Sequence, residues 1–151
     1  EGCNCEAKAH YSVSYFGGFT IPTGTFDSVA DPSYSLGIRP ALHFPAGSLG
    51  LYLGYDNFHN STGGSDFHLL HLSPEIEIVP WTQLCPRPSF HLGVGAYRDE
   101  TGTTKAGFNV GFGLGFCLRQ HLSFVSRYDY RSVHSLSRDY STIQVGLRFS
   151  F

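Results

Sequence analysis

The sequence predicts an all-β protein, an eight-stranded antiparallel up-and-down transmembrane β-barrel. Three observations predict this fold. Eight segments alternate large apolar residues with polar or small ones, the connections between them alternate between short turns and longer loops, and the chain is rich in glycine and aromatic residues. The 151 residues include 18 Gly, 13 Phe and 9 Tyr but no Met. At this length a single domain is expected.

Each of the eight segments has one apolar and one polar face, because successive side chains of a strand point to opposite sides of the sheet. The alternation is strict at the C-terminus, where every second residue from Ile143 to Phe151 is large and apolar. The other seven predicted strands cover, in order, residues 11–21, 34–44, 49–56, 69–78, 90–97, 108–118 and 122–131.

Different residue types produce the alternation along the chain. The apolar face uses tyrosine and phenylalanine in residues 11–21 and mostly leucine in the next three strands. In residues 108–118 large apolar residues alternate with Asn109, three glycines and a cysteine, so that the polar face is almost empty of side chains. Residues 122–131 place two arginines and an aspartate on their polar face. A period of two in every segment predicts strands and no helix.

The connections divide into two classes. Residues 45–48 and 119–121 are predicted tight turns, whereas longer polar loops are expected at residues 23–32, 59–66, 99–104 and 135–139. Short turns at one end and long loops at the other are typical of an up-and-down barrel with both termini on the short-turn side. The exception is a proline-rich connection on the short-turn side, residues 79–88.

Volume decides which face points inward. The interior of an eight-stranded barrel is only wide enough to be filled by side chains. Four to six large apolar groups from every strand would overfill it, whereas the glycine- and serine-rich face fits. The apolar face is therefore expected to contact lipid, with aromatic residues near the interfaces. A soluble lipocalin-like barrel is the alternative fold.

The predicted inner face carries charges of both signs, which we expect to pair within the lumen because an unpaired buried charge is costly. A structural plug is the first interpretation, and an ion path or gate is the alternative. This lumen charge network comprises Arg39, Glu75, Glu77, Arg127, Asp129, Arg131 and Arg148.

The strand number, the loop asymmetry and the C-terminal Val145-Gly-Leu-Arg-Phe-Ser-Phe151 resemble the OmpA-like and OmpX-like eight-stranded outer membrane proteins. The resemblance covers about residues 9–151 and implies a barrel domain there, preceded by a periplasmic segment at residues 1–8. It implies a bacterial outer membrane with both termini in the periplasm, and contact with the lipid bilayer and lipopolysaccharide. In that family the barrel-assembly machinery reads the terminal aromatic and its alternating partners, here Leu147, Phe149 and Phe151.

Four cysteines are expected to gather at the short-turn rim: Cys3, Cys5, Cys85 and Cys117. Disulfides that join the N-terminal segment to the barrel base are the first interpretation, because the number is even. Hairpin register places Cys117 opposite about Arg87. A zinc site and free thiols, or bonds to another chain, are the alternatives.

The remaining candidates for chemistry predict no metal, no cofactor and no catalytic residue. His43, His71 and His91 share the inward parity without regular ligand spacing, which indicates polar filler of the lumen. Ser132, His134 and Asp139 share the outward parity and faintly resemble the lipid A 3-O-deacylase family. That family has the order His-x-Ser-Asn, however, and this chain has Ser-x-His.

The sequence therefore predicts a non-enzymatic membrane protein with a structural or interaction role. The alternatives are a narrow channel for small solutes past Arg39, Arg127 and Arg148, and a lipid-modifying enzyme. A protein partner at the periplasmic base or the barrel wall is compatible with the short loops. Nucleic acid is excluded as a partner, since the net charge is -2 and the chain has no basic stripe.

Overall fold

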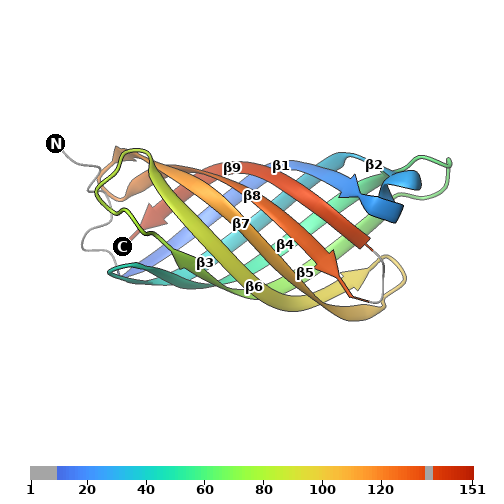
Figure 1. Cartoon of the computed structure of the whole chain (residues 1–151), viewed down its shortest axis with the longest axis horizontal. Helices are drawn as coiled ribbons and strands as arrows, with labels where there is room; N and C mark the ends of the chain where they lie inside the picture. Colours follow the sequence, from blue (N-terminus) through green and yellow to red (C-terminus); the bar gives the residue numbers. More distant parts are fainter. Residues whose placement is uncertain (1–9, 135–137) are drawn as a thin grey trace.

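The structure is a computed structural model that describes residues 10–134 and 138–151, and in this part of the chain eight long strands close into one antiparallel barrel (Figure 1). Each strand pairs with the next along the chain, and the last strand pairs with the first. The strands are β1 (Tyr11–Thr23), β3 (Ser33–Phe44), β4 (Gly47–Asn60), β5 (Phe67–Ile78), β6 (Arg87–Asp99), β7 (Thr104–Arg119), β8 (Leu122–Val133) and β9 (Arg138–Ser150).

Two short elements in the first long loop were not predicted. A 3-10 turn, η1 (Gly24–Ser28), is followed by the two-residue strand β2 (Ala30–Asp31), which pairs with the end of β4. The described residues contain no α-helix, as predicted, and this 3-10 turn is the single helical element among them. The turn forms because Gly24 adopts a positive φ of 61° and Phe26 folds back over the barrel, where only 4% of it is exposed.

Alternation along each strand separates an apolar exterior from a polar interior, as predicted. On the outer face Phe19 is 67% and Val94 is 64% exposed, whereas on the inner face Thr20 and Asn109 are fully buried. The closed ladder gives the strands no free edge, so that nearly all backbone polar groups are paired within the wall.

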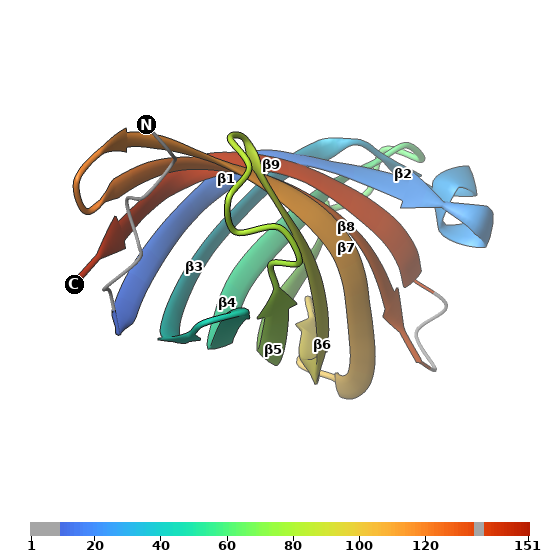
Figure 2. The same cartoon turned by 60° about the vertical axis from the view of Figure 1, so that its left-hand side comes forward.

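The two ends of the barrel differ in their connections. The short turn after β3, the turn after β7 and the end of β9 lie at one end, which we call the base; η1, β2 and the loop after β4 lie at the other, which we call the loop end (Figures 1 and 2). In the described residues no helix is long and apolar enough to cross a membrane.

Candidate functional site

The centre of the lumen holds a cluster of ion pairs. Arg127 contacts Glu75 through Nη2 and Oε2 (2.7 Å) and Asp129 through Nε and Oδ2 (2.6 Å). His91 Nε2 lies 2.6 Å from the other Asp129 oxygen, and Asn109 Nδ2 donates to Glu75 Oε2 at 3.0 Å. The five side chains come from β5, β6, β7 and β8, so the cluster ties together four neighbouring strands.

The lower part of the lumen continues this network toward the base. Arg39 lies between Glu75, at 3.8 Å, and the hydroxyl of Ser48, at 3.1 Å. Ser48 in turn donates to Glu77 at 3.3 Å, and Glu77 accepts a hydrogen bond from Arg148 Nη2 at 3.0 Å. Arg39 therefore links the central carboxylate to the one nearest the base.

The part of the lumen nearer the loop end, which we call its upper part, is organised around Asp56, a buried residue of β4. Its carboxylate accepts hydrogen bonds from the hydroxyls of Ser35 and Tyr140 and lies 2.9 Å from His71 Nε2. Arg131 connects this group to the centre, because its Nε lies 4.0 Å from Asp56 and its Nη2 lies 3.4 Å from Asp129.

Tyr52 separates the central and upper clusters. Its ring lies under both guanidinium groups, with centroid distances of 4.6 Å to Arg127 and 4.8 Å to Arg131. Its hydroxyl accepts a hydrogen bond from Gln144 Nε2 at 2.8 Å, and the same nitrogen donates to Ser35 at 2.7 Å. The ring thus presents its negative π system to two buried cations, a contact that stabilises both.

The charges within these three clusters balance. The four arginines face four carboxylates, so the fully ionised network has no net charge. Paired buried charges of this kind are stable only when most of their hydrogen-bonding capacity is satisfied. The eight charged residues are Arg39, Arg127, Arg131, Arg148, Asp56, Glu75, Glu77 and Asp129.

An apolar cap lies above the network at the loop end. Phe26 of η1 packs against Phe58 with ring centroids 4.8 Å apart, and Phe58 contacts Tyr140 at the same distance. The guanidinium of Arg138 lies 5.4 Å from the ring centroid of Phe26. The buried members of the cap are Phe26, Ala30, Phe58, Leu69, Tyr97, Val133 and Tyr140.

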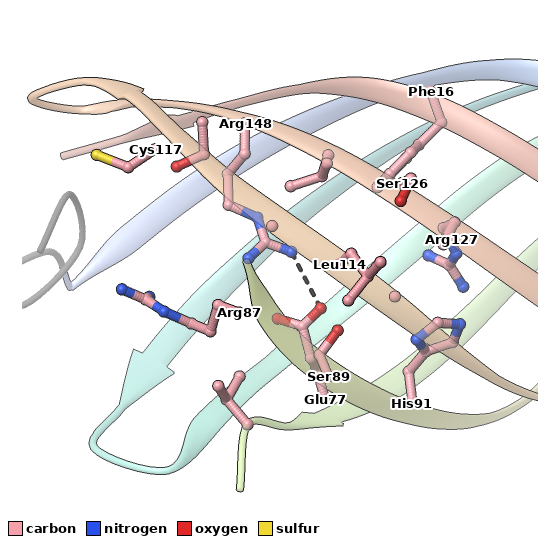
Figure 3. A pocket seen from close by; sticks show the side chains of 15 residues that line it. Phe16, Glu77, Arg87, Ser89, His91, Leu114, Cys117, Ser126, Arg127 and Arg148 are labelled. Carbon is pink, nitrogen blue, oxygen red and sulfur yellow. Dashed lines mark hydrogen bonds and ion pairs between the residues drawn. The ribbon is translucent and has the colours of Figure 1, made fainter. Parts of the chain in front are cut away.

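A small cavity lies at the opposite end, near the base (Figure 3). It has a volume of about 30 Å³ and is lined by Arg87, His91 and Arg148 together with Phe16. Arg148 reaches across it to Glu77 (Figure 3). This volume accommodates one or two water molecules.

Several buried polar atoms of the lumen have no protein hydrogen-bond partner among the described residues. Two of them are Nε and Nη1 of Arg131, and others are the hydroxyls of Ser73, Tyr97 and Thr142. Buried polar groups are rarely left unsatisfied, so we expect water molecules to bind at these atoms.

The predicted network residues all face the lumen, but four further residues of the network were not predicted. Asp56, Tyr52, Gln144 and Tyr140 belong to the same network. The alternation of the sequence already placed the first three of these side chains inside the barrel. Alternation shows only which face of the strand a side chain occupies, however, and not its height in the barrel.

The glycines of β7 leave room for side chains of the neighbouring strands. A Cβ at Gly111 would lie 2.8 Å from His91 Nε2 and 2.9 Å from Asp129 Oδ1, and the nearest Arg127 atom to a Cβ at Gly113 is at 3.8 Å. The glycines therefore accommodate the histidine–aspartate pair more than the arginine.

The cysteines are placed as follows. Cys85 lies between β5 and β6, and Cys117 lies near the end of β7; neither is a free thiol. Arg87 pairs with Gly115, two residues from the predicted position opposite Cys117. Cys3 and Cys5 lie outside the described residues, so the pairing of the four cysteines stays a prediction.

The three inward histidines each contact an oxygen group of the lumen. His43 Nε2 lies 2.7 Å from the Ser12 hydroxyl, while His71 and His91 each contact one aspartate. Within residues 10–134 and 138–151, no group of three or more His, Cys, Asp or Glu residues is arranged to hold a metal ion.

Ser132, His134 and Asp139 do not form a relay. The Ser132 hydroxyl donates directly to Asp139 Oδ1 at 2.6 Å, across the β8–β9 pair. In a Ser-His-Asp triad the imidazole lies between the hydroxyl and the carboxylate. The direct contact uses the proton that a histidine base would remove.

Comparisons with known proteins identify the fold. No protein-family model matches the chain, and no curated protein sequence matches it. Among solved structures, Neisserial surface protein A is similar with a TM-score of 0.73 and 16% identity over 95% of this chain and 98% of that one.

Two further solved structures have the same architecture. The outer membrane protein OprG from Pseudomonas aeruginosa has a TM-score of 0.63 and 13% identity over 95% of this chain and 97% of that one. The outer membrane enzyme PagL has a TM-score of 0.54 and 16% identity over 93% of this chain and 99% of that one. The chain therefore has the fold of the eight-stranded outer membrane β-barrels.

Proposed function

We propose that this chain is an integral protein of a bacterial outer membrane, with a closed lumen and a non-enzymatic structural or interaction role. The observation that carries the proposal is the lumen itself. A charge-balanced network fills it, and an apolar cap covers the network at the loop end. A lumen whose charged groups are paired with one another has little need of a ligand.

The exterior supports the membrane location. Large apolar side chains cover the outer faces of the eight long strands, and a water-soluble protein rarely exposes so continuous an apolar surface. The shortest of these strands has 12 residues, whereas about 9–11 residues span a bilayer. The surrounding partners are then the lipid bilayer and lipopolysaccharide, and the barrel-assembly machinery recognises Leu147, Phe149 and Phe151 during insertion.

Planar bilayer recordings test the closed lumen. The purified protein should insert and give no conductance steps. The variant Phe26→Ala should also be silent, because it opens only the cap and leaves the network below it intact. Conductance of the wild-type protein would contradict the proposal. Conductance of the variant alone would show that the cap, and not the network, is the barrier.

A narrow channel is the second candidate, and the cavity near the base favours it. The cavity and the unpartnered atoms of Arg131 and Tyr97 are sites for water at two levels of the lumen. A continuous water path would have to pass both the Arg127 cluster and the cap. Small, ion-selective steps in the same recordings would support this candidate.

The non-enzymatic assignment has its own test, because the fold is shared with an outer membrane enzyme. Ser132 is held by Asp139 and is not poised as a nucleophile. Cells that express the wild-type protein or Ser132→Ala should therefore have the same lipid A composition by mass spectrometry. Altered lipid A with the wild-type protein alone would overturn the assignment.

We also propose that residues 1–8 are a periplasmic segment that disulfides join to the base, with Cys85 and Cys117 as the anchors on the barrel side. Such a base, or the barrel wall, offers a surface for a protein partner. Peptide mapping of the unreduced protein should recover Cys3 and Cys5 linked to these two residues, and free thiols in that segment would contradict it.

A further inference from the structure

Two prolines interrupt the wall of the barrel at the same level. Pro40 of β3 lies beside Val13 of β1, and Pro74 of β5 lies beside Leu51 of β4. The register of β3 with β4 on either side of the gap sets Pro40 next to Leu51. The four residues therefore form one row across four adjacent strands.

The strand pairing is interrupted on either side of the continuous β4–β5 pair. Pairing of β3 with β4 stops at Ile38 and resumes at Ala41, and pairing of β5 with β6 stops at Leu72 and resumes at Glu75. Proline has no N–H to donate, which is why it is normally confined to sheet edges. A closed barrel has no edge, so each proline leaves a local break in the wall.

A groove of about 510 Å³ lies on the outer surface along this row. Its sides are apolar, and its floor is formed by small residues that face the lumen. On the lumen side of Gly50, the guanidinium carbon of Arg39 lies 2.6 Å from where a Cβ would be. The groove is lined by Tyr11, Ser12, Val13, Pro40, Ala41, Leu42, Leu49, Gly50, Leu51 and Pro74.

We propose that this groove, which we call the proline groove, binds one acyl chain of a phospholipid. The inference rests on the proposed membrane location, because the groove is continuous with the apolar outer surface. It lies in the half of the barrel nearer the base, since Tyr11, Leu42 and Leu49 are each within two residues of a strand end there. With the base in the periplasm, this half contacts the phospholipid leaflet and not lipopolysaccharide.

Shape distinguishes an acyl chain from a second copy of the barrel. A partner barrel would present a convex wall, which cannot enter a concave groove, whereas a flexible chain can follow it. A stable protein interface also needs about 800 Å² on each partner. The groove is confined to ten residues of four neighbouring strands, from Tyr11 on β1 to Pro74 on β5.

Photo-crosslinking tests the proposal. The protein is refolded into vesicles of phosphatidylethanolamine and phosphatidylglycerol that contain a trace of phosphatidylethanolamine with a diazirine in its acyl chain. After irradiation, mass spectrometry should find the label concentrated on the peptides that line the proline groove. Val13→Phe fills the groove and should reduce this labelling about tenfold, which corresponds to the loss of roughly two buried methylene groups.

Two further variants keep the experiment decisive. Val145→Phe makes the same change on β9, away from the groove, and should leave the labelling unchanged. Pro40→Leu restores an N–H and adds a longer side chain, and should reduce labelling even if Val13→Phe does not fold. Insertion of each variant is checked by flotation with the vesicles.

The outcomes distinguish a failure of the groove proposal from a failure of the proposed membrane location. Failure of the wild-type protein to float with vesicles would contradict the proposed function itself. Insertion with labelling spread evenly around the barrel would overturn the groove alone, as would a crosslinked dimer through this face. Loss of the label when lipopolysaccharide is added to the vesicles would overturn the choice of phospholipid.

Discussion

Asp129 is the carboxylate at which four side chains of the lumen meet. It contacts Arg127, Arg131, His91 and Asn109. Asp129→Ala should destabilise the barrel by about 3–5 kcal/mol, because removal of one partner leaves buried cations uncompensated. Urea unfolding in lipid vesicles, followed by tryptophan fluorescence, measures the change.

Two matched variants serve as controls for this measurement. Asp66→Ala, in a loop and partly exposed, should change the unfolding free energy little, since exposed ion pairs contribute at most about 1 kcal/mol. The double variant Arg127→Met with Asp129→Leu should be less destabilised than Asp129→Ala, because it removes both signs of charge. A double variant as unstable as the sum of its two single variants would show that the charges do not act as a network.

At the same scale, the sequence predicted which face of its strand a side chain occupies, but not which other side chains it contacts. The inward orientation of Glu75 and Arg127 followed from parity alone. That they touch each other does not follow, because their strands are separated by two others and the stagger between strands sets their heights. Asp56 was placed inward by the same parity and was still left out of the predicted network.

The loop end depends on an ion pair between two elements. Arg138, at the start of β9, donates to both carboxylate oxygens of Glu100, at 2.9 and 2.6 Å. Burial alone would raise the pKa of Glu100, but the hydrogen bonds and charge of Arg138 outweigh it and hold the pKa below its usual value of 4.5. The pair is therefore fully formed above that value and is lost as the pH falls through the lowered pKa.

An NMR titration of the Glu100 carboxyl carbon checks this prediction. The midpoint should lie below 4.5 in the wild-type protein. It should move back up in Arg138→Gln, because the variant keeps a polar side chain but loses the positive charge. The same midpoint in both proteins would show that the pair does not persist in solution.

Among the elements, the long strands were predictable and the loop-end elements were not. A period of two over many residues identifies a strand whatever its neighbours are. The turn η1 and the strand β2 form because Phe26 and Ala30 are buried in the cap, which is a tertiary contact. Pro40 and Pro74 were visible as prolines within predicted strands, and their meaning emerged only when the register put them in one row.

At the scale of the whole molecule, the narrow lumen that determines which face points inward also restricts where a ligand can bind. The apolar face is outside because the lumen has no room for it, and the polar face must then satisfy itself inside. A lumen that pairs its own charges leaves few groups available to a ligand. Specific contacts are then expected on the outer wall, at the loops or at the base, and these surfaces must be assigned by their orientation in the membrane.

The orientation is predicted to place the loop end outside the cell and the base in the periplasm. A short epitope tag inserted between Gly63 and Gly64, in the loop after β4, should bind antibody on intact cells. The same tag inserted after Ala46, in the turn between β3 and β4, should bind only after the outer membrane is permeabilised. Both sites lie in exposed connections, where insertions are tolerated without loss of the strands on either side. The reverse pattern would show that the barrel has the opposite orientation in the membrane, with the proline groove in the lipopolysaccharide leaflet.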